Sequence, residues 1–279
     1  MIKVALMYDF DKTLSLKDML EFSFIPALGF KNPKKFWEEV NVLKNGNQMD
    51  SILAYMYMML KKADAAQQPI RRSDFVALGK DVLLYPGLED WFDRINEAGR
   101  QLGLEIEHYI ISSGLTEIIE GTSIADKFRK IYACRYYYDE NGVAKWPALV
   151  VNYTTKTQYI FRINKQVLSE SEDAQLNHYV PHQDRPIPFT RMIYVGDGLT
   201  DVPCMKLVKE YGGHSIAVYN TDNKKHKKGA LQLVKENRVN FTAAADYSSG
   251  SDMEVIMKAI LNEIAAQAEL ERLEQITNQ

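Results

Sequence analysis

The sequence predicts an α/β protein with a doubly wound parallel sheet, and three short apolar runs carry that prediction. Residues 2–6, 105–111 and 192–195 are rich in aliphatic and β-branched side chains, as buried strands are. Stretches with helical periodicity follow or separate them. Alternating strands and helices are typical of a parallel sheet, whose ligands bind outside the carboxyl ends of the strands. A functional site is therefore expected where these runs end.

The composition is ordinary for a globular protein and argues against several classes. The 279 residues carry a net charge of −3, so no basic footprint indicates a nucleic-acid partner. No apolar stretch approaches the roughly 18 residues that cross a bilayer, and the N-terminal apolar run meets Asp9 before any signal cleavage site. Cys134 and Cys204 have no metal-ligand spacing and suggest a reducing compartment. We expect a cytoplasmic protein without nucleic-acid or membrane partners; its oligomeric state is not indicated.

Two carboxylates, Asp9 and Asp11, follow the first apolar run. A pair this close repels unless a metal ion or a shared proton intervenes, and carboxylate oxygens suit Mg²⁺. One of the two would also be free to act as a nucleophile. The alternative is structural: Asp11 would cap a helix that starts near Thr13, and Asp9 would lie in a solvated turn. These few residues alone leave both interpretations open.

Residues 15–84 show apolar positions at helical spacing and no strand pattern, so they predict an inserted helical unit. Prolines at positions 26, 33 and 69 divide the unit into pieces. The sequence Tyr85-Pro86-Gly87 then precedes a helix that ends near Gly99. The predicted domains are a core of residues 1–14 and 85–279 and a helical cap of residues 15–84.

The second run ends in Ser112-Ser113-Gly114, and a helix is expected over residues 115–128. A small, flexible loop at a helix N-terminus can bind an anion, and Ser112 adds a hydroxyl donor. A serine that only caps the helix is the alternative, above all for Ser113.

A hairpin and a lysine follow. Asn141-Gly142 between aromatic and apolar runs predicts a β-hairpin over residues 131–152. Lys156 then opens a helix, where its charge opposes the helix dipole unless an anion lies nearby; a solvated lysine is as compatible with the pattern. A proline-containing loop over residues 169–190 leads to the third apolar run.

The third run is followed by Gly196-Asp197-Gly198 and, four residues after Asp197, by Asp201. Glycines here permit close approach of the backbone to a ligand. A helix over 202–211, strands over 214–219 and 240–244 and an amphipathic helix over 252–276 complete the predicted core. The side chains that follow the three strands, which are Asp9, Asp11, Ser112, Asp197 and Asp201, would then meet in one crevice.

In these motifs the chain resembles the haloacid dehalogenase superfamily of phosphohydrolases. The segment from Asp9 to Thr13 resembles the first motif of the family, Ser112 the second, Lys156 or Lys165 the third, and the segment from Gly196 to Asp201 the fourth. The helical unit resembles the cap of members similar to phosphoserine phosphatase. The resemblance implies a Rossmann-like core with a small inserted α-helical cap.

The resemblance also implies a role for each matching residue. Asp9 would be the nucleophile that becomes an aspartyl phosphate, and Asp11 the general acid and then the base. Mg²⁺ would be held by the carboxylates of Asp9 and Asp197 and by the backbone carbonyl of Asp11. Three further residues, Ser112, Ser113 and Lys156, would bind phosphoryl oxygens. Asp201 would orient the metal's waters or the lysine, and Lys156 is preferred to Lys165 because it begins its helix.

The expected function is a Mg²⁺-dependent phosphatase that acts on a small phosphorylated metabolite. One alternative is a phosphotransferase or mutase that uses the same intermediate. Another is a non-catalytic protein that binds a phosphoryl ligand on the same fold, because a fold does not fix a function. The sequence does not indicate which metabolite is the substrate.

Overall fold

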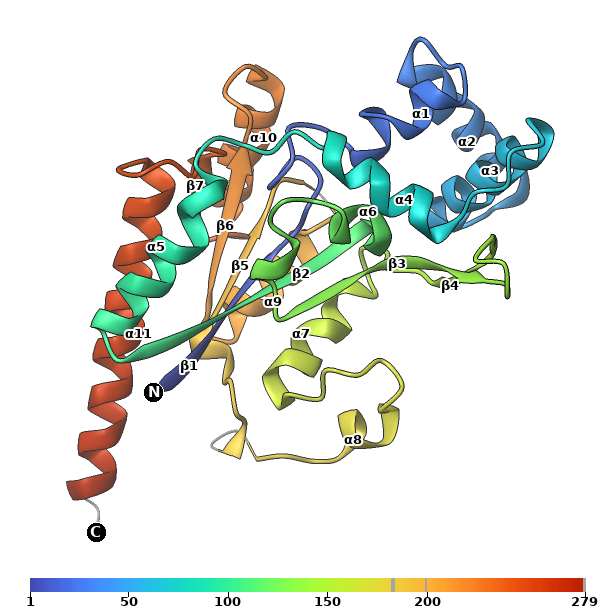
Figure 1. The fold of residues 1–279 in the computed structure, drawn as a ribbon. Helices are drawn as coiled ribbons and strands as arrows, with labels where there is room; N and C mark the ends of the chain where they lie inside the picture. Colours follow the sequence, from blue (N-terminus) through green and yellow to red (C-terminus); the bar gives the residue numbers. More distant parts are fainter. Residues whose placement is uncertain (182–183, 199, 278–279) are drawn as a thin grey trace.

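The computed structural model describes residues 1–181, 184–198 and 200–277, and its centre is a seven-stranded sheet (Figure 1). The strands lie in the order β4-β3-β2-β1-β5-β6-β7, and every neighbouring pair is parallel except β3 with β4. Their bounds are β1 Ile2–Tyr8, β2 Leu104–Leu115, β3 Lys130–Tyr138, β4 Ala144–Leu149, β5 Met192–Gly196, β6 His214–Tyr219 and β7 Phe241–Ala244. The predicted α/β fold with a doubly wound parallel sheet is confirmed.

The register of the central strands brings their carboxyl ends together. Tyr8, the last residue of β1, lies opposite Ile110 of β2 and Val195 of β5. The backbone N–H of Asp9 donates to the carbonyl of Val195 over 2.9 Å, so the chain after β1 is still held against β5. The strands are apolar because both faces of the sheet are covered; every residue from Val4 to Tyr8 is fully buried.

Helices cover both faces of the sheet (Figure 1). α5 (Leu88–Gln101) packs against β2 and against the long C-terminal α11 (Asp252–Thr277). α7 (Lys156–Lys165) packs against β2 and α9 (Val202–Glu210), and α10 (Lys224–Lys235) packs against β6 and β7. Right-handed crossovers between parallel strands produce this two-sided cover. No helix within the described ranges combines the length and the apolar character needed to cross a membrane.

Between β1 and α5 the chain forms a separate group of helices. They are η1 (Met19–Glu21), α1 (Phe24–Ala27), α2 (Pro33–Asn47), α3 (Ser51–Ala65), α4 (Arg72–Leu78) and η2 (Gly79–Asp81). The two connections to the core run side by side, because Leu16 N–H donates to Leu83 and Tyr85 N–H donates to Leu14. We call residues 15–84 the helical segment; its standing as a separate domain remains a prediction.

The core hairpin β3–β4 extends to this helical segment (Figure 1). The N–H of Ala144 donates to the carbonyl of Ile70 over 2.9 Å, and the N–H of Arg72 donates to that of Gly142 over 3.1 Å. The Tyr136 hydroxyl reaches the carbonyl of Met56. The hairpin, predicted from Asn-Gly, therefore also supports the helices that stand over the strand ends.

The helix expected over residues 115–128 is wrong. β2 continues to Leu115 with a register shift after Ile111, and α6 spans only Thr116–Glu120 before the short η3 (Ala125–Lys127). The reason is a close approach at Gly121, where a Cβ would lie 1.8 Å from the carbonyl oxygen of Val76 in α4. The contact with the helical segment thus ends α6 after about one turn, which local periodicity could not show.

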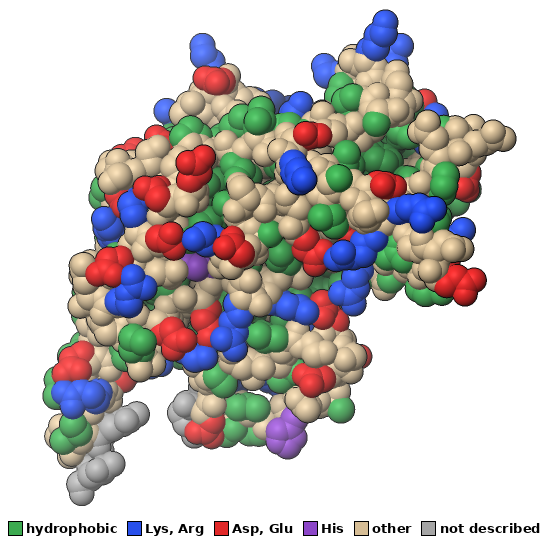
Figure 2. Space-filling view, viewed as in Figure 1, with side chains coloured by type: hydrophobic (Ala, Val, Ile, Leu, Met, Phe, Trp, Pro, Cys, Tyr) green, Lys and Arg blue, Asp and Glu red, His purple; other side chains and the backbone are tan. Residues whose placement is uncertain are grey.

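The surface carries no strong charge asymmetry on the face that Figure 2 shows. Acidic and basic side chains are intermingled there, in keeping with the net charge of −3.

Candidate active site

Three aspartates meet where β1 and β5 end. Asp9 directly follows β1, Asp197 directly follows β5, and Asp201 immediately precedes α9. One carboxylate oxygen from each lies within 4.8 Å of the others. Asp201 is fully buried and Asp9 is 5% exposed. Buried carboxylates this close require positive charge around them.

Lys156 supplies part of that charge. Its Nζ donates to Asp9 Oδ1 over 2.8 Å and to Asp201 Oδ1 over 2.7 Å, and the side chain is buried. Lys156 is the first residue of α7, and Asn152 shapes the preceding turn by accepting from the N–H groups of Thr154 and Thr155. Lys165 at the other end of α7 donates instead to carbonyl oxygens outside the site.

Asp201 is fixed from two further sides. The buried Tyr194 hydroxyl donates to its Oδ1 over 2.9 Å, and the N–H of Gly198 donates to Oδ2 over 3.4 Å. A Cβ at position 196 would lie 2.6 Å from Asp201 Cγ, so only glycine fits there without displacement. Asp201 Oδ1 thus accepts hydrogen bonds from both Tyr194 and Lys156.

Asp11 lies on the loop after β1, which turns sharply at Lys12, where φ is +59°. Its Oδ1 accepts from the backbone N–H of Met19 over 2.7 Å. The alternative in which Asp11 caps a helix near Thr13 is wrong, because the chain forms turns there and η1 begins only at Met19. The carboxylate of Asp11 is not part of the group formed by Asp9, Asp197 and Asp201.

Ser112 and Ser113 lie on the irregular end of β2, not at a helix N-terminus. Ser112 is fully buried, and its Oγ accepts from the N–H of Gly114 over 3.0 Å. The Ser113 carbonyl accepts from the Tyr55 hydroxyl over 2.7 Å, which ties this end of β2 to α3. The buried Ser113 Oγ has no hydrogen-bond partner among the described residues.

Burial and mutual repulsion raise the pKa values of the acidic groups. Burial, followed by the charge of Asp201, raises the pKa of Asp9 to about 6 against the opposing effect of Lys156. Burial, Asp201 and Asp9 raise the pKa of Asp197 to about 8. Burial, Asp18 and Asp9 raise the pKa of Asp11 well above its usual range. Burial lowers the pKa of Lys156, but Asp201 and Asp9 outweigh it and raise that pKa overall.

This pattern indicates that Lys156 alone does not neutralise the site. The donors available to a cation are hard carboxylate oxygens on Asp9 and Asp197, which are typical of Mg²⁺ sites. A divalent cation beside them would remove the repulsion that raises their pKa values. The residues present therefore fit a Mg²⁺ ion.

A cavity of about 260 Å³ opens onto these groups. The core contributes Asp9, Asp11, Lys12, Ser112, Ser113, Gly114, Lys156, Asp197 and Thr200, and the helical segment contributes Asp18, Met19, Leu20, Trp37, Val40, Asn41, Ser51, Ile52 and Tyr55. All the residues predicted for phosphate and metal binding, except the supporting Asp201, thus line one space.

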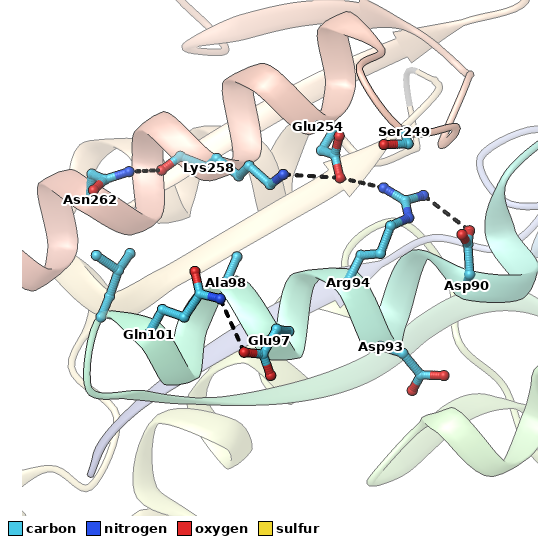
Figure 3. A pocket seen from close by; sticks show the side chains of 11 residues that line it. Asp90, Asp93, Arg94, Glu97, Ala98, Gln101, Ser249, Glu254, Lys258 and Asn262 are labelled. Atoms are coloured by element: carbon cyan, nitrogen blue, oxygen red, sulfur yellow. Dashed lines mark hydrogen bonds and ion pairs between the residues drawn. The ribbon is translucent and has the colours of Figure 1, made fainter.

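A larger hollow of about 640 Å³ lies between α5 and α11 and shares no residue with this cavity (Figure 3). Its charged groups pair with one another: Arg94 contacts Asp90 and Glu254, and Lys258 contacts Glu254. It lies away from the strand ends that carry the acidic cluster, so it is not the candidate site.

Several residues of the site had no signal in the sequence. Asp18 and Trp37 line the cavity from the helical segment, and Tyr194 and Asn152 support the acidic cluster and Lys156. None belongs to a spaced motif, and Tyr194 reads as an ordinary apolar strand residue. Only the packing of distant segments identifies them.

Comparison with known proteins identifies the family of the chain. Residues 6–206 match the family model of haloacid dehalogenase-like hydrolases. An uncharacterized protein of Borreliella burgdorferi is 28% identical over 277 residues, which cover 90% of this chain and 93% of that protein.

Solved structures extend the likeness to the fold. A haloacid dehalogenase family hydrolase of Salmonella enterica has a TM-score of 0.58 at 16% identity, covering 91% of this chain and 69% of that one. A phosphoserine phosphatase, solved as an analogue of its phospho-aspartyl intermediate, has a TM-score of 0.54 at 15% identity, covering 93% of this chain and 99% of that one. The family match spans the residues from β1 to α9 that build the cavity, and the chain therefore belongs to the haloacid dehalogenase-like hydrolases.

Proposed function

We propose that this hydrolase is a Mg²⁺-dependent phosphatase that moves the phosphoryl group of a small phosphate monoester onto Asp9 and then to water. The observation that carries the proposal is the convergence of Asp9, Asp197, Lys156 and the serines on one cavity. A carboxylate nucleophile, two hydroxyls and an ammonium group suit a phosphoryl group. The fold shared with phosphoserine phosphatases supports the same class of reaction.

In the first step an oxygen of Asp9 attacks phosphorus, and the bond from phosphorus to the leaving alcohol breaks. Asp11 gives its proton to the leaving oxygen. Its raised pKa, caused by burial, Asp18 and Asp9, favours the protonated form that this step requires. The N–H of Met19 holds Asp11 Oδ1, so the carboxyl group is oriented before substrate enters.

In the second step the now ionised Asp11 takes a proton from water, and the hydroxide formed attacks the phosphorus of the aspartyl phosphate. The bond between phosphorus and the Asp9 oxygen breaks, which releases inorganic phosphate and restores the carboxylate. The same group acts as acid and then as base because the two steps mirror each other. Water must reach the cavity only after the alcohol has left, a role suited to the helical segment.

The remaining residues position the phosphoryl group. Lys156 and the Ser112 and Ser113 hydroxyls donate to its oxygens, and Asp201 keeps Lys156 aimed at Asp9. The carboxylates of Asp9 and Asp197, with the backbone carbonyl of Asp11, would hold Mg²⁺. When bound, Mg²⁺ supplies positive charge that offsets the repulsion between the substrate and the carboxylates.

The test is phosphate release from p-nitrophenyl phosphate, with Mg²⁺ and with chelator. Asp9→Asn should abolish turnover, because an amide cannot form the acyl phosphate, while Asp93→Asn, at an exposed position on α5, should leave it unchanged. Circular dichroism checks that both variants fold. Appreciable activity in Asp9→Asn would refute the assignment of the nucleophile.

Assays of the same protein distinguish two alternative functions. A phosphotransferase or mutase would pass the phosphoryl group to an added sugar rather than to water. A non-catalytic binding protein would release no phosphate from any ester and would not trap beryllium fluoride at Asp9 in the presence of Mg²⁺.

A further inference from the structure

Resting on the proposed phosphatase function, we propose that the leaving alcohol of the substrate carries a cationic ammonium group and no carboxylate, and that Asp18 and Trp37 bind that ammonium group. The cavity has two ends of different chemistry. The core supplies the phosphoryl end, with Asp9, Ser112 and Lys156, and the helical segment supplies the opposite wall. The leaving alcohol must face that second wall.

Asp18 brings a negative charge to the wall. Its Oδ1 accepts from the N–H of Leu20 over 3.1 Å and so caps η1. Its other oxygen has no hydrogen bond or ion pair with any described residue. The charge of Lys12 acts on Asp18 and also on Asp197, Asp11 and Glu21, and Lys12 forms no ion pair with Asp18 in the described chain. Asp18 therefore keeps an oxygen available to a ligand.

Trp37 and Tyr55 form an aromatic corner that lines the same cavity as Asp18. Their ring centroids are 6.1 Å apart and the rings are inclined by 74°. The indole N–H of Trp37 donates to Glu21 over 3.2 Å, and the Tyr55 hydroxyl donates to Ser113, so both rings are fixed before a ligand binds. A fixed aromatic face and a carboxylate that line one cavity are favourable partners for an ammonium group.

The charge balance of the cavity points the same way. Four carboxyl groups and two ammonium groups line it; with Asp11 protonated, as the first step requires, and with one divalent ion and a phosphate dianion added, the site is still negative. A cation on the alcohol reduces this charge, whereas a carboxylate would increase it. Among the described residues of the helical segment, none of those lining the cavity is basic. The volume of about 260 Å³ limits the alcohol to a few carbons.

The experiment compares kcat/KM for short esters of matched length with Mg²⁺. Phosphoethanolamine should exceed the neutral 2-hydroxyethyl phosphate by about tenfold, the size of a partly desolvated cation contact. Phosphoglycolate should have the lowest kcat/KM of the three esters. Preference for phosphoglycolate or O-phosphoserine would overturn the inference, since Lys12 would then receive a carboxylate. Turnover of p-nitrophenyl phosphate without preference for the cationic ester would overturn it while the proposed function stands. No turnover of any ester would refute the proposed function itself.

Variants test the two residues. Asp18→Asn keeps an oxygen for the N–H of Leu20 but loses the charge. It should lower the ratio of kcat/KM for phosphoethanolamine to that for 2-hydroxyethyl phosphate about tenfold, mainly through KM; a loss common to both esters reflects the effect of Asp18 on the pKa of Asp11. Trp37→Leu should also lower kcat/KM for phosphoethanolamine relative to 2-hydroxyethyl phosphate. Glu38→Gln is the control: Glu38 is exposed on α2, the helix that carries Trp37, and its replacement should not change kcat/KM for either ester. An equal loss for both esters in Asp18→Asn would overturn the inference.

Discussion

The ammonium group of Lys156 lies within hydrogen-bond reach of both Asp9 and Asp201, and Lys156→Met removes this positive charge with little change in shape. Methionine fills nearly the same volume, so repacking should cost less than about 1.5 kcal/mol. Loss of one partner from a buried ion pair costs about 3–5 kcal/mol, because the other charge stays buried. Here two carboxylates lose their partner, at 2.8 and 2.7 Å. The free energy of unfolding should therefore fall by about 3–5 kcal/mol in chelator at pH 8.

The loss should be smaller at pH 5. Without Lys156 the pKa of Asp9 rises further from its value of about 6, so the carboxyl group takes up a proton and the repulsion disappears. Mg²⁺ should restore part of the lost stability at pH 8, since it binds only the folded state. Urea unfolding followed by tryptophan fluorescence, at both pH values and with or without Mg²⁺, measures these differences.

The matched control is Lys165→Met at the other end of α7. Lys165 donates to the carbonyl oxygens of Leu176 and His178 over 2.6 and 2.8 Å, so its replacement should cost about 1 kcal/mol. It should leave phosphate release intact, whereas Lys156→Met should abolish it. A loss below about 1 kcal/mol in Lys156→Met, or greater damage to activity from Lys165→Met, would refute the role given to Lys156.

Three further predictions concern the protonation of Asp9, the packing of Gly121 and the hydrogen bond from Tyr194 to Asp201. In chelator the free energy of unfolding of the wild type should fall as pH rises from about 4 to about 6. Folded Asp9, whose pKa is about 6, keeps a proton that the unfolded chain releases near pH 3.8. Urea unfolding across this pH range measures the change, and a free energy of unfolding that rises with pH would contradict the prediction. Gly121→Ala should destabilise the protein by at least about 1–3 kcal/mol, since its Cβ would lie 1.8 Å from a carbonyl oxygen of α4. Gly229→Ala is the control and should not destabilise the protein, because no atom lies within 4 Å of its Cβ. Thermal unfolding of both variants measures the difference. Tyr194→Phe should cost about 1–3 kcal/mol by leaving the buried Asp201 short of a donor, and unchanged urea stability would show that the 2.9 Å bond contributes nothing.

Local sequence determined the strands and the turn that depend on short-range patterns. The apolar runs that end at Asp9, Ser112 and Asp197 are β1, β2 and β5, and Asn141-Gly142 is the turn of the β3–β4 hairpin. Backbone and side-chain preferences of a few neighbouring residues suffice for such elements. Because parallel strands present their carboxyl ends at one edge, the sequence also indicated which polar residues would gather there.

The tertiary structure decided what depends on contacts between distant residues. It extended β2 past Ser113 and ended α6 early, because Gly121 meets α4. It placed Lys156 against Asp9, 147 positions away, and brought Trp37 to the cavity. Such contacts are set by how whole elements pack, and packing energy is shared among many buried side chains that no local pattern encodes. The sequence therefore indicated the polar residues of the candidate site, Lys156 among them, whereas their contacts and the cavity wall formed by the helical segment came only from the fold.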